Sequence, residues 1–283
     1  MAQQAQRKEK AAESVPAAPE AAPTTGPSAG AMRFERPRGL SPKGWAILGG
    51  ILVLLNFPVL HYALLRSEPE ASVALPFSDD FSQPSTVEQN YFSTGGYWRV
   101  VGGQLLSPGV KNNPLWLKAS LPANVAVEFD VRTEGDAGDL KVELFGDGTD
   151  HASGYVFIHG GWNNSVSIIA RLDEHGTPLT RLEAEARRVA LAKALPDADL
   201  VKTGVFRKDT RMRVEANPFP VTRGRTYHWR IERKDGQLRW FIDGQPFMDF
   251  QDPMPLVGKG HDRFGFSSWD SDLYFDNLKV TPL

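Results

Sequence analysis

The chain has 283 residues, with 32 Lys and Arg against 34 Asp and Glu, 41% apolar residues and 10% aromatic residues. This balance excludes a wholly disordered chain and the basic excess of a nucleic-acid-binding protein, so we expect no nucleic-acid partner. The lack of cysteine excludes disulfides, thiolate metal sites and cysteine nucleophiles. These averages combine three unlike segments, which are taken below in chain order.

The N-terminal segment is poor in large apolar side chains. Residues 1–32 contain ten Ala and four Pro, and most of the others are polar. Such a segment buries too little apolar surface to offset the entropy lost on ordering. The sequence therefore predicts a disordered tail over residues 1–43.

An apolar run follows, with the sequence WAILGGILVLLNFPVLHYALL at residues 45–65. A helix of this length spans about 30 Å, the thickness of the apolar part of a bilayer. We therefore predict a transmembrane helix over residues 44–66 and a linker over residues 67–76. A cleavable signal peptide is the alternative, but the preceding tail is long and the run exceeds the usual apolar region of about 7–15 residues.

The charges that flank this run indicate its orientation. Arg33, Arg36, Arg38 and Lys43 precede it, whereas Arg66 is the only basic residue close behind it. Lys and Arg collect on the cytoplasmic side of membrane spans. We therefore predict a signal anchor with the N-terminus in the cytoplasm and a periplasmic or extracellular C-terminal domain.

Residues 77–283 read as short β-runs separated by Gly, Pro, Asn and Asp. Eight runs alternate apolar and polar residues or are rich in strand-forming residues: 125–132, 141–145, 155–159, 165–171, 226–233, 238–242, 263–267 and 273–280. The dipeptides Asp235-Gly236 and Asp243-Gly244 predict tight hairpin turns. So many short strands in one segment predict an all-β fold, a single antiparallel β-sandwich.

One stretch departs from the β pattern. Residues 179–195, with the sequence LTRLEAEARRVALAKAL, are rich in Ala, Leu, Glu and Arg and end before Pro196. These residue types favour a helix. We predict a short helical insertion that packs on the sandwich, with docking to a partner as the alternative.

Several motifs of the exported segment resemble those of a known superfamily. They are FSDDF at 77–81, YWRV at 97–100, GQLL at 103–106, GRTYHW at 224–229, LRWFIDG at 238–244 and FDNLKV at 275–280. Their order is similar to that of the concanavalin A-like lectin/glucanase superfamily, in particular its laminin-G-like and 3-keto-disaccharide hydrolase-like members. The resemblance implies a jelly roll of two antiparallel sheets with adjacent first and last strands.

The resemblance also implies a structural calcium ion near the junction of the terminal strands. In this chain it would use Asp79 or Asp80 together with Asp276. Calcium takes six to eight oxygen ligands, so backbone carbonyls would have to complete the site. We favour ordinary turn aspartates at these positions, with a structural calcium ion as the alternative and the only cofactor that the resemblance implies.

A catalytic pair of glutamates is poorly matched. Family 16 glycoside hydrolases of the resembling superfamily carry Glu-x-Asp-x-Glu or Glu-x-Asp-x-x-Glu, whereas here Glu128, Asp130 and Glu134 have one residue too many between the outer glutamates. Retaining hydrolysis needs two carboxyl groups about 5–5.5 Å apart. Arg132 would also keep nearby carboxylates ionised. We therefore predict no catalytic residues and keep Glu128, Asp130 and His159 as the alternative catalytic set.

The polar face of the strands is the predicted ligand surface, because in the resembling fold such a face can form a groove. An ordinary solvated sheet face is the alternative. Sugars are bound by carboxylates, amides and stacked aromatic rings. Trp162 is the expected stacking residue, in the loop HGGWNN at 159–164, whereas Trp98, Trp229 and Trp240 lie in strand patterns and are expected in the core. The predicted ligand-binding residues are Glu128, Asp130, Arg132, Glu143, His159, Trp162, His228, Arg230 and Glu232.

Three functions follow as hypotheses. The favoured one is a membrane-anchored exported domain that binds a glycan, or a glycan-bearing envelope partner, without catalysis. The second is a glycoside hydrolase or lyase that acts on a disaccharide or modified sugar. The third is a scaffold for envelope proteins that docks through the predicted insertion at 179–195.

Overall fold

The computed structural model describes residues 39–61, 70–179, 181, 211–216 and 219–283. The chain divides into two compact units, Met1–Leu65 and Arg66–Leu283. Each unit is described by itself. The predicted tail lies outside the described residues up to residue 38, and the predicted helical insertion does so at residue 180 and from residue 182 onward.

The first unit contains the apolar helix α1 (Pro42–Leu60). Ser41 caps its N-terminus, because the Ser41 hydroxyl accepts a hydrogen bond from the Gly44 amide at 3.2 Å. Asn56, a polar side chain inside the run, donates to the Leu52 carbonyl one turn earlier at 2.8 Å. The helix is long and apolar enough to cross a membrane, and none of its residues is buried in the structure.

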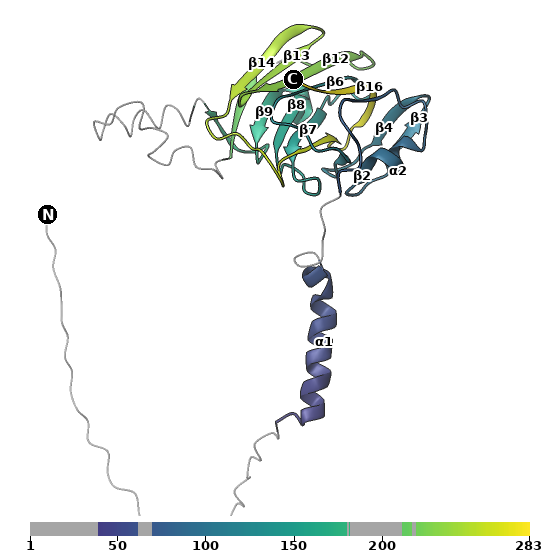
Figure 1. The fold of residues 1–283 in the computed structure, drawn as a ribbon, viewed down its shortest axis with the longest axis vertical. Helices are drawn as coiled ribbons and strands as arrows, with labels where there is room; N and C mark the ends of the chain where they lie inside the picture. The colour runs from purple at the N-terminus through teal and green to yellow at the C-terminus, as the bar shows by residue number, and fades with distance from the viewer. Residues whose placement is uncertain (1–38, 62–69, 180, 182–210, 217–218) are drawn as a thin grey trace, which may run out of the picture. The chain divides into compact units, whose positions relative to one another are not determined.

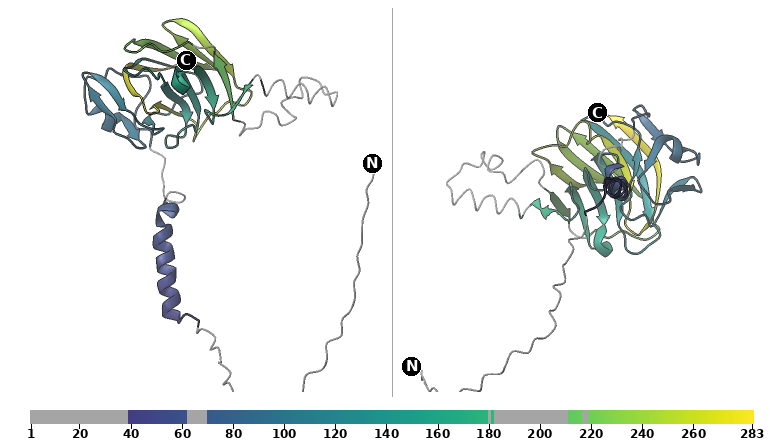
Figure 2. Two further views of the ribbon diagram at one scale, coloured as in Figure 1. Left: turned by 180° about the vertical axis from the view of Figure 1, so that it is seen from behind. Right: turned by 90° about the horizontal axis from the view of Figure 1, so that it is seen from below.

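The second unit is a sandwich of two sheets, which Figures 1 and 2 show face to face. Sheet A has the order β14 (Gln245–Gln251), β13 (Gln237–Ile242), β12 (Tyr227–Lys234), β6 (Val125–Thr133), β16 (Asp272–Pro282), β4 (Gln104–Pro108) and β3 (Arg99–Val101), with β1 (Phe77–Asp79) paired to β16. Sheet B has the order β10 (Thr177–Pro178), β11 (Met212–Ala216), β9 (Val166–Arg171), β8 (Tyr155–Gly160), β7 (Leu140–Gly146), β15 (Arg263–Ser267), β5 (Leu115–Leu117) and β2 (Tyr91–Ser93).

Strand pairing is antiparallel everywhere in the described residues except between β10 and β11. All eight predicted runs are strands, and the first strand pairs with the last, as the resemblance implied. The predicted hairpin turns join β12 to β13 and β13 to β14, and in both turns the Asp and the Gly have positive φ. The predicted all-β antiparallel jelly roll is therefore confirmed.

The core lies between the sheets and is unusually aromatic. The predicted core residues Trp98, Trp229 and Trp240 are buried there, and the rings of Trp229 and Trp240 lie 4.4 Å apart. Two short helices connect strands: α2 (Thr86–Asn90) lies between β1 and β2, and α3 (Gly161–Asn164) lies between β8 and β9. A core of this kind supplies most of the stabilisation of a domain that has no disulfides.

The sandwich begins earlier than residue 77. The amides of Ser72 and Val73 both donate to the Lys118 carbonyl at 2.9 Å, and Val73 and Leu75 pack against the core. The second half of the predicted linker is therefore part of the folded unit.

The two sheets differ on their outer faces. In sheet A, β6 and β12 alternate between buried residues and residues that are half-buried or exposed. In sheet B, β7, β8 and β15 are buried on both faces. The outer face of β8 and β9 carries a small apolar cluster of buried residues, formed by Val156, Ile158, Ile168 and Ala170. Sheet B therefore has an outer face that other parts of the chain cover.

Candidate ligand-binding pocket

Six of the predicted ligand-binding residues share the outer face of sheet A. They are Glu128, Asp130 and Arg132 of β6 and His228, Arg230 and Glu232 of β12. In the register of the two strands, Arg230 lies opposite Glu128 and His228 lies opposite Asp130. The sequence therefore identified a real cluster of charged side chains.

Within this cluster the charges pair with one another. Arg230 donates to Glu128 and to Glu232, and the Nδ1 atom of His228 lies 2.8 Å from Asp130. Arg132 pairs with Glu134 and also stacks over the Tyr274 ring at 4.0 Å. Each of these groups is partly exposed to solvent. Their role in ligand binding stays a prediction, and none of them lines the pocket described below.

His159 does not lie on this face, and its predicted placement there is wrong. Its side chain is fully buried between the sheets, stacked on Phe219 with 5.3 Å between ring centroids. Its Nε2 atom lies 2.7 Å from the Phe219 carbonyl oxygen. Burial lowers the pKa of His159 to about 4, partly offset by that hydrogen bond. The strand pairing explains the error, because His159 lies opposite the core residue Leu140.

The alternative catalytic set therefore does not assemble. Glu128 and Asp130 face outward from sheet A, whereas His159 faces the core from sheet B. A shared reaction site needs its groups within hydrogen-bond reach of one substrate. The placement of His159 in the core contradicts such a site.

The three aspartates of the predicted calcium site are committed elsewhere. Asp79 accepts hydrogen bonds from the Phe81 amide, the Thr86 hydroxyl and the Tyr91 hydroxyl. Asp80 accepts from the Ser82 amide, and Asp276 accepts from Gln104 and from the Asn277 amide. The part of the chain that the structure describes holds no group of three or more acidic or histidine side chains placed for a metal ion. A calcium ion shared by these aspartates stays a prediction.

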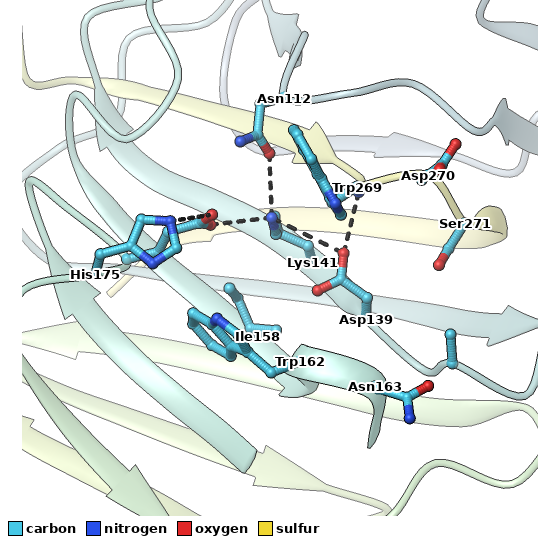
Figure 3. A pocket seen from close by; sticks show the side chains of 12 residues that line it. Asn112, Asp139, Lys141, Ile158, Trp162, Asn163, His175, Trp269, Asp270 and Ser271 are labelled. Atoms are coloured by element: carbon cyan, nitrogen blue, oxygen red, sulfur yellow. Dashed lines mark hydrogen bonds and ion pairs between the residues drawn. The ribbon is translucent and has the colours of Figure 1, made fainter. Parts of the chain in front are cut away.

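A pocket of about 440 Å³ lies on the covered outer face of sheet B (Figure 3). Its lining comes from five stretches of chain: Asn112; Ala137, Asp139 and Lys141; Ile158, Trp162 and Asn163; Glu174 and His175; and Trp269, Asp270 and Ser271. Lys141 and Ile158 are strand partners on β7 and β8, so they form its floor. In Figure 3 the side chains of Asp139 and Lys141 lie between those of Trp162 and Trp269.

Two of the lining residues are tryptophans with accessible rings. Trp162 is 40% exposed and Trp269 is 51% exposed, although both sit in the wall of a pocket. The Arg213 guanidinium lies 5.6 Å from the Trp162 ring, and the Lys111 amine lies 6.0 Å from the Trp269 ring. The Trp162 ring is thus exposed enough to contact a ligand, and its role in stacking on a sugar stays a prediction.

The pocket wall has an uncommon backbone. Asn112, Asp139, Trp162, Asn163 and Asp270 all line it and all have positive φ. Asn and Asp adopt this conformation more readily than other residues with a side chain, whereas for Trp162 it costs about 1–2 kcal/mol. Residues held in this region concentrate at binding and catalytic sites, where the surrounding structure imposes the conformation.

Asn164 holds the Trp162 turn in that conformation. Its amide oxygen accepts from the Val221 amide at 2.7 Å, and its amide nitrogen donates to the Val221 carbonyl at 2.8 Å. This two-bond contact ties the turn after β8 to the chain that precedes β12. The Trp162 side chain is therefore positioned before any ligand arrives.

The pocket floor contains a chain of buried charges. The Lys141 amine donates to Asn112 at 3.1 Å and to Glu174 at 3.0 Å, and it lies 3.9 Å from Asp139. His151 lies 3.5 Å from Glu174 and 2.6 Å from Glu143, and Glu143 also accepts from the Ala152 amide at 2.7 Å. Glu143, a predicted ligand residue, is fully buried behind the pocket and does not line it.

This environment separates the pKa values of the charged groups. Burial raises the pKa of Asp139 to about 6, against the opposing effect of Lys141. Burial would also raise the pKa of Glu174, but hydrogen bonds from His151 and Lys141 lower it to about 2. Burial would lower the pKa of His151, but Glu143 raises it to about 9. At pH 7 all three groups are therefore mainly charged.

Sequence reasoning missed most of this pocket. Lys141 alternates with Glu143 on β7, so period two placed both on one face, but a lysine on a strand is ordinarily solvated. Asp139 and Trp269 carry no motif, and Glu174 lies outside every predicted strand. The available signal was a pair of tryptophans in loops, Trp162 beside two asparagines and Trp269 beside Asp270 and Ser271.

The sequence matches no family model and no curated protein. Similar solved structures include the carbohydrate-binding module CBM66 from Bacillus subtilis, with 11% identity, a TM-score of 0.46, and 68% of this chain and 95% of that chain covered. A protein of unknown function with a galectin-like fold from Bacillus subtilis has 15% identity and a TM-score of 0.44 over 73% and 94%. The β-glucanase of Bacillus licheniformis has 8% identity and a TM-score of 0.46 over 75% and 100%.

All three TM-scores lie below 0.5, and the identities do not exceed 15%. At such identities and TM-scores the likeness concerns the fold alone. What this chain binds has to be argued from its own pocket.

Proposed function

We propose that this protein is a single-pass membrane protein whose exported sandwich binds carbohydrate, without catalysis, in the pocket on sheet B. The observation that carries the proposal is the pair of accessible tryptophans, Trp162 and Trp269, beside buried carboxylates in one pocket. The apolar faces of sugar rings stack on indole rings, and sugar hydroxyls donate to carboxylates. A glycan offers both kinds of contact along its whole length.

The bonding of the carboxylates supports binding rather than catalysis. Glu174 is held by Lys141 and His151, and Asp139 accepts a hydrogen bond from the Trp269 amide at 3.0 Å. A nucleophile or base held by two cations is weakened, because its charged form is stabilised before the reaction. Groups bound in this way remain suited to accepting hydrogen bonds from ligand hydroxyls.

The membrane anchor rests on α1 and on its flanking charges. The helix is apolar, long enough and not buried in the structure. Arg33, Arg36, Arg38 and Lys43 precede its apolar part, so we propose a cytoplasmic N-terminus and a periplasmic or extracellular sandwich. Reporter fusions after residue 283 that are active only outside the cytoplasm test this orientation. Activity of a cytoplasmic reporter at the same position would contradict it.

The glycan proposal is tested on an array with the full-length protein in a detergent that has no sugar headgroup. We expect binding to at least one glycan class, a loss of about tenfold in Trp162→Ala and in Trp269→Ala, and a larger loss in the double variant. Tyr97→Ala is the matched control, because Tyr97 is exposed and does not line the pocket. Absence of all binding, or binding that survives the double variant, would contradict the proposal.

One observation favours hydrolysis as a second candidate. Asp139, with a raised pKa of about 6, and Glu174, with a lowered one of about 2, face the same pocket. Carboxyl groups with separated pKa values act as acid and base in glycoside hydrolases. Release of reducing sugar by the wild type, lost in Asp139→Asn, would establish this candidate in place of binding alone. The envelope-scaffold hypothesis concerns an insertion outside the described residues and stays a prediction.

A further inference from the structure

The buried chain of charges beside the pocket has an excess of negative charge. The chain of ion pairs contains three carboxylates and two cations. The carboxylates belong to Asp139, Glu143 and Glu174, and the cations belong to Lys141 and His151. All five side chains are largely removed from solvent. A charge in such surroundings is costly unless an opposite charge compensates it. Among these five groups the carboxylates therefore outnumber the cations by one, and at the rim the exposed His175 lies 3.6 Å from Glu174.

Asp139 is the least compensated of the three. Glu143 has His151 at 2.6 Å, and Glu174 has Lys141 at 3.0 Å. Asp139 has the same Lys141 amine at 3.9 Å, which it shares with Glu174. Burial raises the pKa of Asp139, and the charge of Lys141 offsets this rise only in part. Asp139 lines the pocket, whereas Glu143 does not, so the excess charge faces the ligand space.

Lys141, Arg213 and Lys111, three cations at the pocket within the described part of the chain, each take part in ion pairs. Lys141 is 1% exposed and directs its amine to Asn112, Glu174 and Asp139. At the rim, Arg213 pairs with Glu215 at 2.6 Å and Lys111 pairs with Asp270 at 3.4 Å. A negatively charged ligand would therefore be repelled by the carboxylates of the pocket. To pair with one of these cations, it would have to break an existing ion pair.

We infer that the pocket selects glycans that carry a free amino group, with the ligand ammonium placed at Asp139, and that it rejects acidic glycans. This inference rests on the proposed function and adds the charge class of the ligand. A ligand ammonium supplies the positive charge that the buried chain lacks, while the sugar ring stacks on Trp162 or Trp269. A carboxylate-bearing sugar at the same place would add a fourth negative charge.

The experiment uses matched glycans and the full-length protein in a detergent without a sugar headgroup. An array carries several hexose oligosaccharides, each in three forms with a hydroxyl, a primary amine or a carboxylate at C6. At pH 7.5 we expect the amine form of a bound oligosaccharide to bind about tenfold more tightly than the hydroxyl form, and the carboxylate form more weakly than both. Equal binding of the three forms, or preference for the carboxylate, overturns the inference.

The variant Asp139→Asn tests whether the preference for amine-bearing glycans depends on the Asp139 carboxylate. The asparagine amide oxygen can still accept from the Trp269 amide, so the substitution removes charge at nearly constant shape. We expect the amine-to-hydroxyl affinity ratio to fall from about ten to about one. The matched control is Asp249→Asn, an exposed aspartate of β14 that does not line the pocket, and its ratio should equal that of the wild type. An unchanged ratio in Asp139→Asn overturns the assignment.

A pH series gives a second readout. The groups that face Asp139 are Lys141, Glu174 and His151, and the pKa values of about 2 for Glu174 and about 9 for His151 keep both charged between pH 5 and pH 7.5. The ratio should therefore fall toward one near pH 5, where Asp139 is protonated and a primary amine stays charged. His175 also lines the pocket, so His175→Gln serves as the control and should retain the pH dependence.

The outcomes separate this inference from the function on which it rests. If hydroxyl forms bind through Trp162 and Trp269 with no gain for the amine forms, the carbohydrate site stands and the inference fails. If no form of any glycan binds, the proposed function fails, and the inference fails with it.

Discussion

The charged side chains on the outer faces of the two sheets differ in their exposure to solvent. On sheet A, charged side chains from neighbouring strands pair across the surface and remain partly in water, as Arg230 does with Glu128 and Glu232. On sheet B, fewer charges are present, but they are buried under loops and linked in a chain from Glu143 to Asp139. The burial of the charged side chains, rather than their number, therefore distinguishes the candidate site.

The largest expected difference between the faces is in stability. Lys141→Met leaves Asp139 and Glu174 buried beside each other without their shared cation, so we expect a loss of about 3–5 kcal/mol in the free energy of unfolding. Chemical denaturation of the full-length protein, followed by tryptophan fluorescence, measures it. A loss below about 1 kcal/mol would mean that the ion pairs of sheet B contribute as little to stability as the exposed ion pairs of sheet A.

The core histidine gives a pH-dependent effect of nearly the same size. The pKa of His159 is about 4 in the folded protein, below the ordinary value of about 6.5. The unfolded chain therefore binds the proton more readily, and the stabilisation present above pH 6.5 is lost as the pH falls toward 4, by roughly 3 kcal/mol.

Comparison with His159→Gln isolates this effect from the other acid titrations. The variant should lose less stability than the wild type between pH 6.5 and pH 4, as measured by denaturation at each pH. Parallel pH profiles for the two proteins would show that His159 is not held neutral in the core.

A smaller effect is expected from the turn that carries Trp162. Asn164→Ala removes both hydrogen bonds to Val221 and the asparagine that favours a left-handed backbone. We expect a loss of about 1–2 kcal/mol in stability and of about tenfold in glycan affinity, because the Trp162 ring is no longer held in place. Unfolding and array binding are measured on the same preparations, with Asn277→Ala on sheet A as the control.

The smallest effects are expected on sheet A. Arg230→Met and Glu128→Gln break partly exposed ion pairs, so each should cost at most about 1 kcal/mol of stability. Glycan affinity should stay within about twofold of the wild-type value. A tenfold loss of affinity in Glu128→Gln would move the ligand site back to the face that the sequence analysis favoured.

The fold was largely predictable because its signals are local. Alternation with period two identified β6 and β12, and Asp-Gly dipeptides identified the turns on either side of β13, because only a few residues decide each of these features. Trp162 was found for the same reason, since its loop stands out by composition. His159 was misplaced because the position after a buried run has no local sign of which sheet face it joins.

The candidate site was less predictable because its contacts join distant residues. Lys141 bonds to Asn112, 29 positions earlier, and to Glu174, 33 positions later. Trp269 donates to Asp139 across 130 positions. No sequence periodicity links residues so far apart. The loops that bury Lys141 contain no motif that would predict its burial.

The segment order, the apolar helix, the strands and the aromatic core can be predicted from local sequence, because hydrophobic pattern and turn chemistry act over short stretches of chain. Only the tertiary structure decided which outer face is covered and which charges lose contact with water. That decision sets the pKa values of Asp139, Glu174 and His151. It also turns Lys141 from an ordinary strand lysine into the centre of a pocket, since burial makes each unpaired charge costly.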